Sequence, residues 1–149
     1  ELATCREHNI PLKIIIMKKT LFIICACVLG LFSLNSCSHS ELDGKWKVES
    51  IEGVELGELF NEATLEINTS KGEFYGVTGV NNLNGNVSVV GDKIKFTDGP
   101  MTRMAADPHS MEVETAYVHA LSMVKSYSLE DGKLLLKDSV GQVVMTLVN

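Results

Sequence analysis

Cysteine is missing from the larger part of this chain. All four cysteines lie within the first 37 of its 149 residues, at Cys5, Cys25, Cys27 and Cys37. A domain formed after residue 37 can therefore contain no disulfide, no thiolate zinc site and no thiol nucleophile. Such a domain depends on its apolar core, which a chain of about 110 residues is long enough to build.

Positive charge is also scarce. From residue 37 onward there are 9 Lys and Arg residues against 17 Asp and Glu residues, a formal net charge of −8 compared with −6 for the whole chain. Because no basic stripe is present to neutralise phosphates, nucleic acid is a poor partner for this protein. The simplest role for the acidic surface is solubility close to a membrane face.

Few residues are suited to metal binding or catalysis. After residue 37 the histidines are His39, His109 and His119, and the last two lie ten positions apart. That spacing does not stack two imidazoles on one helix face, as metal ligands require. Neither a nucleophile elbow nor a catalytic pair of carboxylates can be recognised. The sequence therefore predicts a protein that is not an enzyme and has no metal or cofactor.

The N-terminal region has the pattern of a bacterial lipoprotein signal. Met17 is followed by Lys18 and Lys19, and then by an almost wholly apolar run over residues 21–34. This run is shorter than the roughly 20 residues of a membrane-spanning helix. Leu34-Asn35-Ser36-Cys37 resembles a lipobox, in which the cysteine thiol forms a thioether to diacylglycerol and becomes the mature N-terminus. Cys37 is therefore the predicted lipidation site.

This pattern divides the chain and predicts where the protein lies. Acyl chains on Cys37 would anchor it stably, because each buried methylene contributes about 0.8 kcal/mol. The signal pattern places the protein in the bacterial cell envelope. The residue after Cys37 is Ser38 and not the aspartate that retains enteric lipoproteins in the inner membrane, so the outer membrane is favoured. A cytosolic N-terminal helix and a secretory signal without lipid are the alternatives. The expected segments are an upstream non-native extension (1–16), a signal peptide (17–36), a lipidated tether (37–41) and a folded domain (42–149).

The folded domain alternates between apolar and polar residues in short runs. In the first run Trp46 and Val48 alternate with charged residues, which is typical of a half-buried strand. Gly91-Asp92 predicts a hairpin turn between two such runs, and residues 81–85, rich in Asn and Gly, predict a tight turn or bulge. The expected strands cover residues 45–51, 63–67, 73–77, 87–90, 93–96, 126–129, 133–137 and 143–148.

These runs predict a mainly β fold with about seven to eight short antiparallel strands and one inserted α-helix. A small β-barrel-like domain is the expected architecture, because closure removes the unpaired strand edges of such a set. An α+β fold with an open sheet and a helix is the alternative. Asp107 is a good N-cap for the helix, and Pro108 suits its first position. The helix face repeats at spacings of three and four and comprises Met111, Glu114, Tyr117, Val118, Leu121 and Val124.

Glu114 is the one carboxylate on this apolar helix face. A carboxylate facing a core needs a partner. Arg103, which lies shortly before the helix, is the expected partner, and Thr102 or Asn81 would complete a polar cluster at one end of the barrel. We expect the cluster to be structural, with ligand binding as the alternative.

The asparagines near residue 82 and the single tryptophan each allow two interpretations. Asn81, Asn82 and Asn84, beside Gly85, are expected to supply left-handed backbone and side-chain caps in a turn. The alternative is that they line a polar pocket. Trp46 is expected to anchor the core, with ligand stacking as its alternative role.

Four motifs follow one another along the folded domain: Gly44-Lys45-Trp46, Gly76-Val77-Thr78-Gly79-Val80-Asn81, Met101-Thr102-Arg103-Met104-Ala105-Ala106 and Glu114-x-x-Tyr117-x-x-x-Leu121. In this order they resemble the META domain family, whose best-known bacterial members are the HslJ-like heat-shock proteins. The resemblance covers about residues 42–147, and it implies a small β-barrel-like domain in the bacterial envelope. It also implies an association with heat and envelope stress, but no known enzyme activity or ligand.

Two positions depart from the family pattern. Many relatives have cysteines where this chain has Val80 and Ala106. The resemblance thus implies that these two residues are neighbours, with Cα atoms roughly 5.5 Å apart as a disulfide would need. Apolar packing would then replace a cross-link that contributes about 2–4 kcal/mol, and redox sensing is not expected in this chain.

The sequence therefore predicts a lipid-anchored, non-catalytic envelope protein that serves in stress tolerance or envelope maintenance, through interaction with an envelope protein. A carrier of a small apolar ligand is one alternative, and a core filled by Trp46, Phe74, Phe96 and Leu136 would exclude it. An inhibitor of an envelope-attacking enzyme such as lysozyme is another alternative. Its acidic loop at residues 52–62 would meet a basic enzyme through complementary charge.

Overall fold

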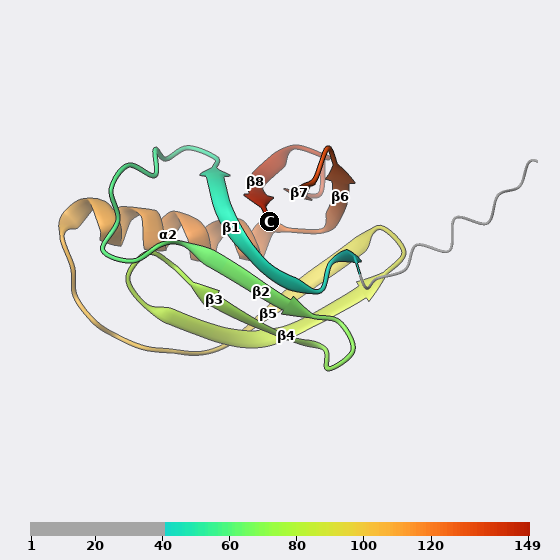
Figure 1. The fold of residues 1–149 in the computed structure, drawn as a ribbon, viewed down its shortest axis with the longest axis horizontal. Helices are drawn as coiled ribbons and strands as arrows, with labels where there is room; N and C mark the ends of the chain where they lie inside the picture. Colours follow the sequence, from blue (N-terminus) through green and yellow to red (C-terminus); the bar gives the residue numbers. More distant parts are fainter. Residues whose placement is uncertain (1–40) are drawn as a thin grey trace, which may run out of the picture. The chain divides into compact units, whose positions relative to one another are not determined.

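The computed structural model describes residues 41–149 (Figure 1). The upstream extension, the signal peptide and Cys37 lie outside the described residues. The helix, α2 (Pro108–Met123), is inserted between the fifth and sixth strands. The strands are β1 (Gly44–Ile51), β2 (Thr64–Asn68), β3 (Glu73–Val77), β4 (Asn82–Val90), β5 (Lys93–Met101), β6 (Ser126–Glu130), β7 (Lys133–Lys137) and β8 (Val143–Val148).

The eight strands form one closed antiparallel ring. Each strand pairs with its neighbours in the sequence, and β1 closes the ring by pairing with β8. The predicted mainly β, barrel-like fold with one inserted helix is confirmed, and the sheet is not open. Residues 41–149 fall within one compact unit that holds the whole ring and a hydrophobic core of its own, which is what a domain needs in order to fold alone.

Strand pairing in the ring is least extensive between β5 and β6. These strands share only the pair Lys93 and Ser126, which is flanked by backbone hydrogen bonds from Ile94 to Lys125 and from Tyr127 to Asp92. Between these two strands the chain leaves the sheet and forms helix α2, which packs against β1, β5 and β8. In Figure 1 the helix runs behind β1 and β2.

Two short turns set the register of the hairpins. Val90 pairs with Lys93 across Gly91-Asp92, as predicted, and Gly91 has a φ of 60°. Between β6 and β7, Asp131 and Gly132 have φ values of 51° and 76°. Positive φ at both positions is typical of a type I′ turn, which matches the right-handed twist of the strands.

The segment at 81–85 divides between a turn and a strand. The turn ends at Asn81, whose carbonyl accepts a hydrogen bond from the Thr78 N–H at 2.9 Å, and β4 begins at Asn82. A bulge follows, because Leu83 pairs with Met101 while Gly85 pairs with Asp98, which leaves one extra residue in β5. Asn82 and Asn84 are therefore strand residues, and their predicted role as turn residues is wrong.

Helix α2 begins as the sequence predicts. The Asp107 carboxylate accepts hydrogen bonds from the N–H and the hydroxyl of Ser110, at 2.9 and 2.6 Å, and these bonds lower its pKa. Pro108 occupies the first turn. The buried face is rotated from the predicted one, since Met111 and Val118 are only half-buried. It consists of Ser110, Val113, Glu114, Tyr117, Ala120 and Leu121.

Side chains fill the inside of the ring. Trp46, Phe74, Phe96 and Leu136 are all buried in one apolar cluster, and the rings of Phe74 and Phe96 meet edge to face at 5.2 Å. The Trp46 Nε1–H donates to the Leu42 carbonyl at 2.9 Å, so its polar atom is satisfied. The predicted anchoring role of Trp46 agrees with this packing. These four are the side chains whose burial was expected to argue against a carrier of a small apolar ligand.

Candidate functional site

Glu114 is held in a buried hydrogen-bond network at one end of the ring. Its Oε2 accepts from the Thr78 hydroxyl at 2.6 Å and from the Asn81 N–H at 3.1 Å. Its Oε1 accepts from Asn81 Nδ2 at 3.2 Å. All three side chains are buried, so these donors replace the water that the carboxylate loses.

Asn81 connects this carboxylate to the segment that follows β5. Its Oδ1 accepts from the Met104 N–H at 2.7 Å and from the Thr102 hydroxyl at 2.9 Å. Its Nδ2 also donates to the Met104 carbonyl at 3.0 Å. The network thus joins the turn after β3, the segment after β5 and helix α2. Its hydrogen bonds hold these three segments together.

Arg103 does not belong to this network, and its predicted ion pair with Glu114 is wrong. Arg103 is exposed and forms no ion pair or hydrogen bond within residues 41–149. Its neighbours Thr102 and Met104 face Asn81, and the donors around Glu114 are neutral. The sequence could not show this, because hydroxyl and amide groups can satisfy a carboxylate as well as a cation can.

Val80 and Ala106 differ in their exposure. Val80 is fully buried outside the main apolar cluster, and Ala106 is half-buried. The hydrogen bonds between Asn81 and Met104 bring the two segments together one residue from Val80 and two residues from Ala106. That the side chains of Val80 and Ala106 touch stays a prediction.

We expect Val80→Cys combined with Ala106→Cys to form a disulfide under oxidant, because the segments that carry both residues are already joined. The cross-link would appear as faster migration on a non-reducing gel and as the loss of two free thiols in mass spectrometry. Val80→Cys combined with Ala105→Cys is a matched control, since Ala105 is exposed whereas Ala106 is half-buried. A double variant that stays reduced would show that the two positions are not neighbours.

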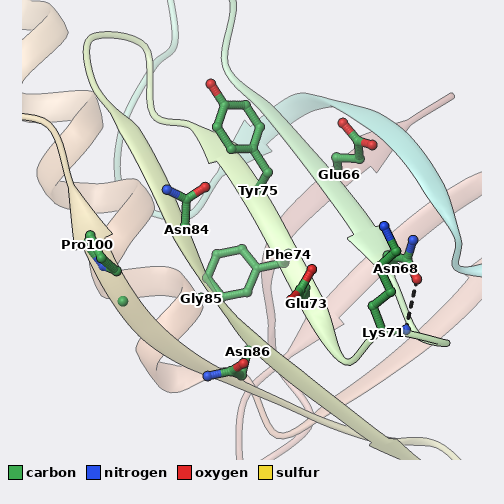
Figure 2. Close-up of a pocket in the computed structure, with 11 residues that line it drawn as sticks. Glu66, Asn68, Lys71, Glu73, Phe74, Tyr75, Asn84, Gly85, Asn86 and Pro100 are labelled. Atoms are coloured by element: carbon green, nitrogen blue, oxygen red, sulfur yellow. Dashed lines mark hydrogen bonds between the residues drawn. The ribbon is translucent and has the colours of Figure 1, made fainter.

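A polar groove lies on the outer face of β2, β3, β4 and β5 (Figure 2). Its volume is about 490 Å³, within the usual range for ligand sites. Outward-facing residues meet across the strands, with Glu66 paired to Tyr75 and Tyr75 to Asn84. In the next row Glu73 pairs with Asn86. The register thus gathers these polar side chains from segments separated in the sequence.

Two glycines are among the residues that line the groove, Gly85 on β4 and Gly99 on β5. Gly85 faces the Phe74 ring and the Thr97 carbonyl, and a Cβ at Gly85 would collide with both. Gly99 lies in the bulge beside the Asn84 backbone, where a Cβ would come within 2.9 Å of the Asn84 carbonyl oxygen. Figure 2 shows Phe74 in the middle of the labelled residues, between Tyr75 and Asn86.

Most polar groups of this groove have no partner in the protein. Within the described chain, the side chains of Glu66, Glu73, Tyr75, Asn84 and Asn86 form no hydrogen bond or ion pair. The alternative interpretation of the sequence placed Asn81, Asn82 and Asn84 in a polar pocket, and of these three only Asn84 lines this groove. The signal that could have found the others is the polar alternation of three consecutive strands, but only their pairing register shows that the residues lie together.

Two other types of site were sought in residues 41–149. No three His, Asp or Glu side chains in this part gather closely enough to hold a metal ion. In the same residues, no helix is both long and apolar enough to span a membrane.

The model of the META domain matches residues 40–149. The chain belongs to the META domain family. The resemblance seen in the sequence motifs is therefore confirmed. Comparison with curated proteins gives no match.

Solved structures share the fold of this META domain. An NMR structure of a protein from Burkholderia xenovorans has 24% sequence identity and a TM-score of 0.54, and the match covers 73% of this chain and 83% of that one. A DUF4847 family protein from Bacteroides vulgatus has 13% identity and a TM-score of 0.51, covering 71% and 92%. Another NMR structure has 16% identity and a TM-score of 0.53, covering 70% and 87%. At these identities the likeness concerns the fold alone.

Proposed function

We propose that this META domain protein is a lipid-anchored, non-catalytic binding protein of the bacterial envelope, which contributes to stress tolerance or envelope maintenance. The domain would act by holding an envelope component in the polar groove on its outer face. The observation that carries the proposal is the set of partnerless polar side chains in this groove, beside an interior that is fully packed.

Two buried titratable side chains support a binding role over a catalytic one. Glu114 receives hydrogen bonds from Thr78 and Asn81, and the Tyr117 hydroxyl donates to the Thr64 carbonyl at 2.8 Å. Both groups are thus engaged in holding the fold. Neither of them lines the groove.

The anchor is supported by the lipobox-like sequence that ends at Cys37. We expect Cys37→Ser to move nearly all of the protein out of the membrane fraction and to abolish incorporation of labelled palmitate, because no thioether can form. Cys27→Ser, within the apolar run, is the matched control and should behave as the parent chain does. A Cys37→Ser protein that stays in the membrane fraction would argue against a lipid anchor.

The binding role can be tested in cells with the full-length chain. A photo-activated cross-linking residue would replace Asn84 in the groove or Ser88, which is also exposed on β4 but lies outside the groove. The proposal expects an envelope component to be captured from position 84 and not from position 88. Identical products at both positions would contradict a role for the groove.

A further inference from the structure

We propose that the polar groove binds an uncharged oligosaccharide chain. This inference rests on the proposed function, because it names the class of ligand that the groove would hold. It depends on the chemistry of six lining residues, which are Glu66, Lys71, Glu73, Tyr75, Asn84 and Asn86.

The hydrogen-bonding groups of the groove match hydroxyl groups. The carboxamides of Asn84 and Asn86 each offer donors and an acceptor, while Glu66 and Glu73 offer acceptors only. A sugar hydroxyl donates one hydrogen bond and accepts others, so a row of hydroxyls can satisfy such a mixed set. These side chains form no hydrogen bonds within the described residues, so a ligand would not have to break existing contacts.

The Tyr75 ring gives the groove a flat apolar surface. Tyr75 lies beside Asn84 in the strand register, and 39% of its surface is exposed. An aromatic ring of this kind presents an apolar face and a polar hydroxyl together. It can therefore pack on the C–H face of a sugar ring while the amides bind the hydroxyl edge.

Charge argues against anionic ligands. Two carboxylates, on Glu66 and Glu73, face one ammonium group, on Lys71, in a domain that is itself acidic. Phosphate groups, nucleic acid and acidic sugars would meet repulsion there and would find none of the arginine clusters that recognise them.

The polar groove does not suit the common ways in which proteins bind peptides, which are strand addition, helix docking and docking of proline-rich segments. Addition of a peptide strand requires a free sheet edge, but β2, β3 and β4, which carry Glu66, Glu73, Tyr75, Asn84 and Asn86, are each paired on both sides. Strand β5 pairs with β6 only at Lys93, but it contributes only Gly99 and Pro100 to the groove. Docking of a helix or a proline-rich segment requires an apolar or aromatic-lined groove, and Tyr75 is the one exposed aromatic among these lining residues. The uncharged sugar chain is therefore the ligand class that the observations favour.

The test is an amide NMR titration of the isolated domain, residues 41–149, with uncharged tetrasaccharides. The probes are β-1,4-linked N-acetylglucosamine, β-1,4-linked glucose, α-1,4-linked glucose and α-1,6-linked mannose, with tetragalacturonate as the acidic comparison. We expect at least one neutral probe to shift the amide signals of β2, β3 and β4, with a Kd on the order of 1 mM or tighter. Tetragalacturonate should bind at least about tenfold more weakly.

Substitutions then locate the site. Asn84→Asp keeps the size of the side chain but replaces its donor with a charge, and Tyr75→Ala removes the ring. Each should raise the Kd by about tenfold, while Ser88→Ala should leave it unchanged. Asn86→Asp provides a second variant of the same kind if either substitution disturbs the fold, which the signal dispersion of the free protein reports.

Several results would overturn the inference. These are no shift with any neutral probe at about 10 mM, shifts confined to other surfaces, or equal binding of the acidic probe. If no sugar binds but position 84 captures a protein in cells, the sugar inference fails and the proposed binding role is supported. If position 84 also captures nothing that position 88 does not, the groove itself fails as a binding site.

Discussion

Glu114→Ala is expected to lower the free energy of unfolding by about 3 kcal/mol. The change removes the acceptor of three hydrogen bonds, which come from Thr78 and Asn81 at 2.6–3.2 Å. Hydrogen bonds to a charged group contribute about 1.5–3 kcal/mol each. Part of this loss is recovered, because the Asn81 N–H also reaches the Thr78 hydroxyl and that hydroxyl can donate to the Asn81 carbonyl instead. Urea unfolding followed by tryptophan fluorescence measures the change.

Glu114→Gln separates the hydrogen bonds from the packing in this network. Glutamine fills nearly the same volume, but its NH₂ group has to face a donor, because both carboxylate oxygens accept in the native structure. We expect a loss of about 1.5 kcal/mol, smaller than for alanine. A glutamine variant as stable as the parent would show that the cost of burying the charge cancels the gain from its hydrogen bonds.

Gly76→Ala is expected to destabilise the domain by about 2–3 kcal/mol through overpacking. A Cβ at Gly76 would lie 2.6 Å from the Tyr117 hydroxyl oxygen. Tyr117 is completely buried and cannot move away easily, since its hydroxyl is bonded to the Thr64 carbonyl. Gly76 has no positive φ, so the cost would come from this contact and not from backbone strain.

A double-mutant cycle tests this cause. In Tyr117→Phe the oxygen is gone, and the nearest ring atom, Cζ, would lie 3.3 Å from the new Cβ. Gly76→Ala should then cost at least about 1 kcal/mol less than it does in the parent. Equal costs in the two backgrounds would show that the alanine disturbs something other than the tyrosine. Chemical denaturation of the four proteins gives the coupling energy.

The same tyrosine makes stability depend on pH in the alkaline range. Burial, with a smaller effect from Asp98, raises the pKa of Tyr117 well above its ordinary value. Above about pH 10 the unfolded chain therefore loses a proton that the folded domain keeps, so stability should fall by about 1.4 kcal/mol per pH unit. The difference between the parent and Tyr117→Phe isolates this contribution, and it should be constant below pH 9 and shrink above pH 10. A difference that stays constant to pH 11.5 would contradict the raised pKa.

The local features of the fold could be predicted because they depend on neighbouring residues. Asp107 and Pro108 mark the start of the helix through backbone geometry and a capping hydrogen bond that forms within four residues. Gly91-Asp92 marks a hairpin for the same reason. The alternation of Trp46 and Val48 with charged residues predicts a strand, because successive side chains of a strand point to opposite faces.

The partner of Glu114 could not be predicted in this way. Proximity in the sequence favoured Arg103, but the chain turns so that Thr102 and Met104 approach Asn81 while Arg103 faces water. Opposite charge gave a plausible pair, but the position of a side chain depends on how three separate segments meet. Only the tertiary structure contains that information.

By itself the sequence determined the mainly β architecture with its inserted helix and the family, since each rests on short-range periodicity or contiguous motifs. The lipid anchor at Cys37 stays a prediction from a contiguous motif of the same kind. The tertiary structure decided that the interior is filled and that the polar groove exists. Glu66, Tyr75 and Asn84 each lie on a different strand, and a shift of one residue in pairing would point any of them into the core. Strand register is fixed by the packing of the whole ring, so the groove follows from the fold and from no single stretch of the chain.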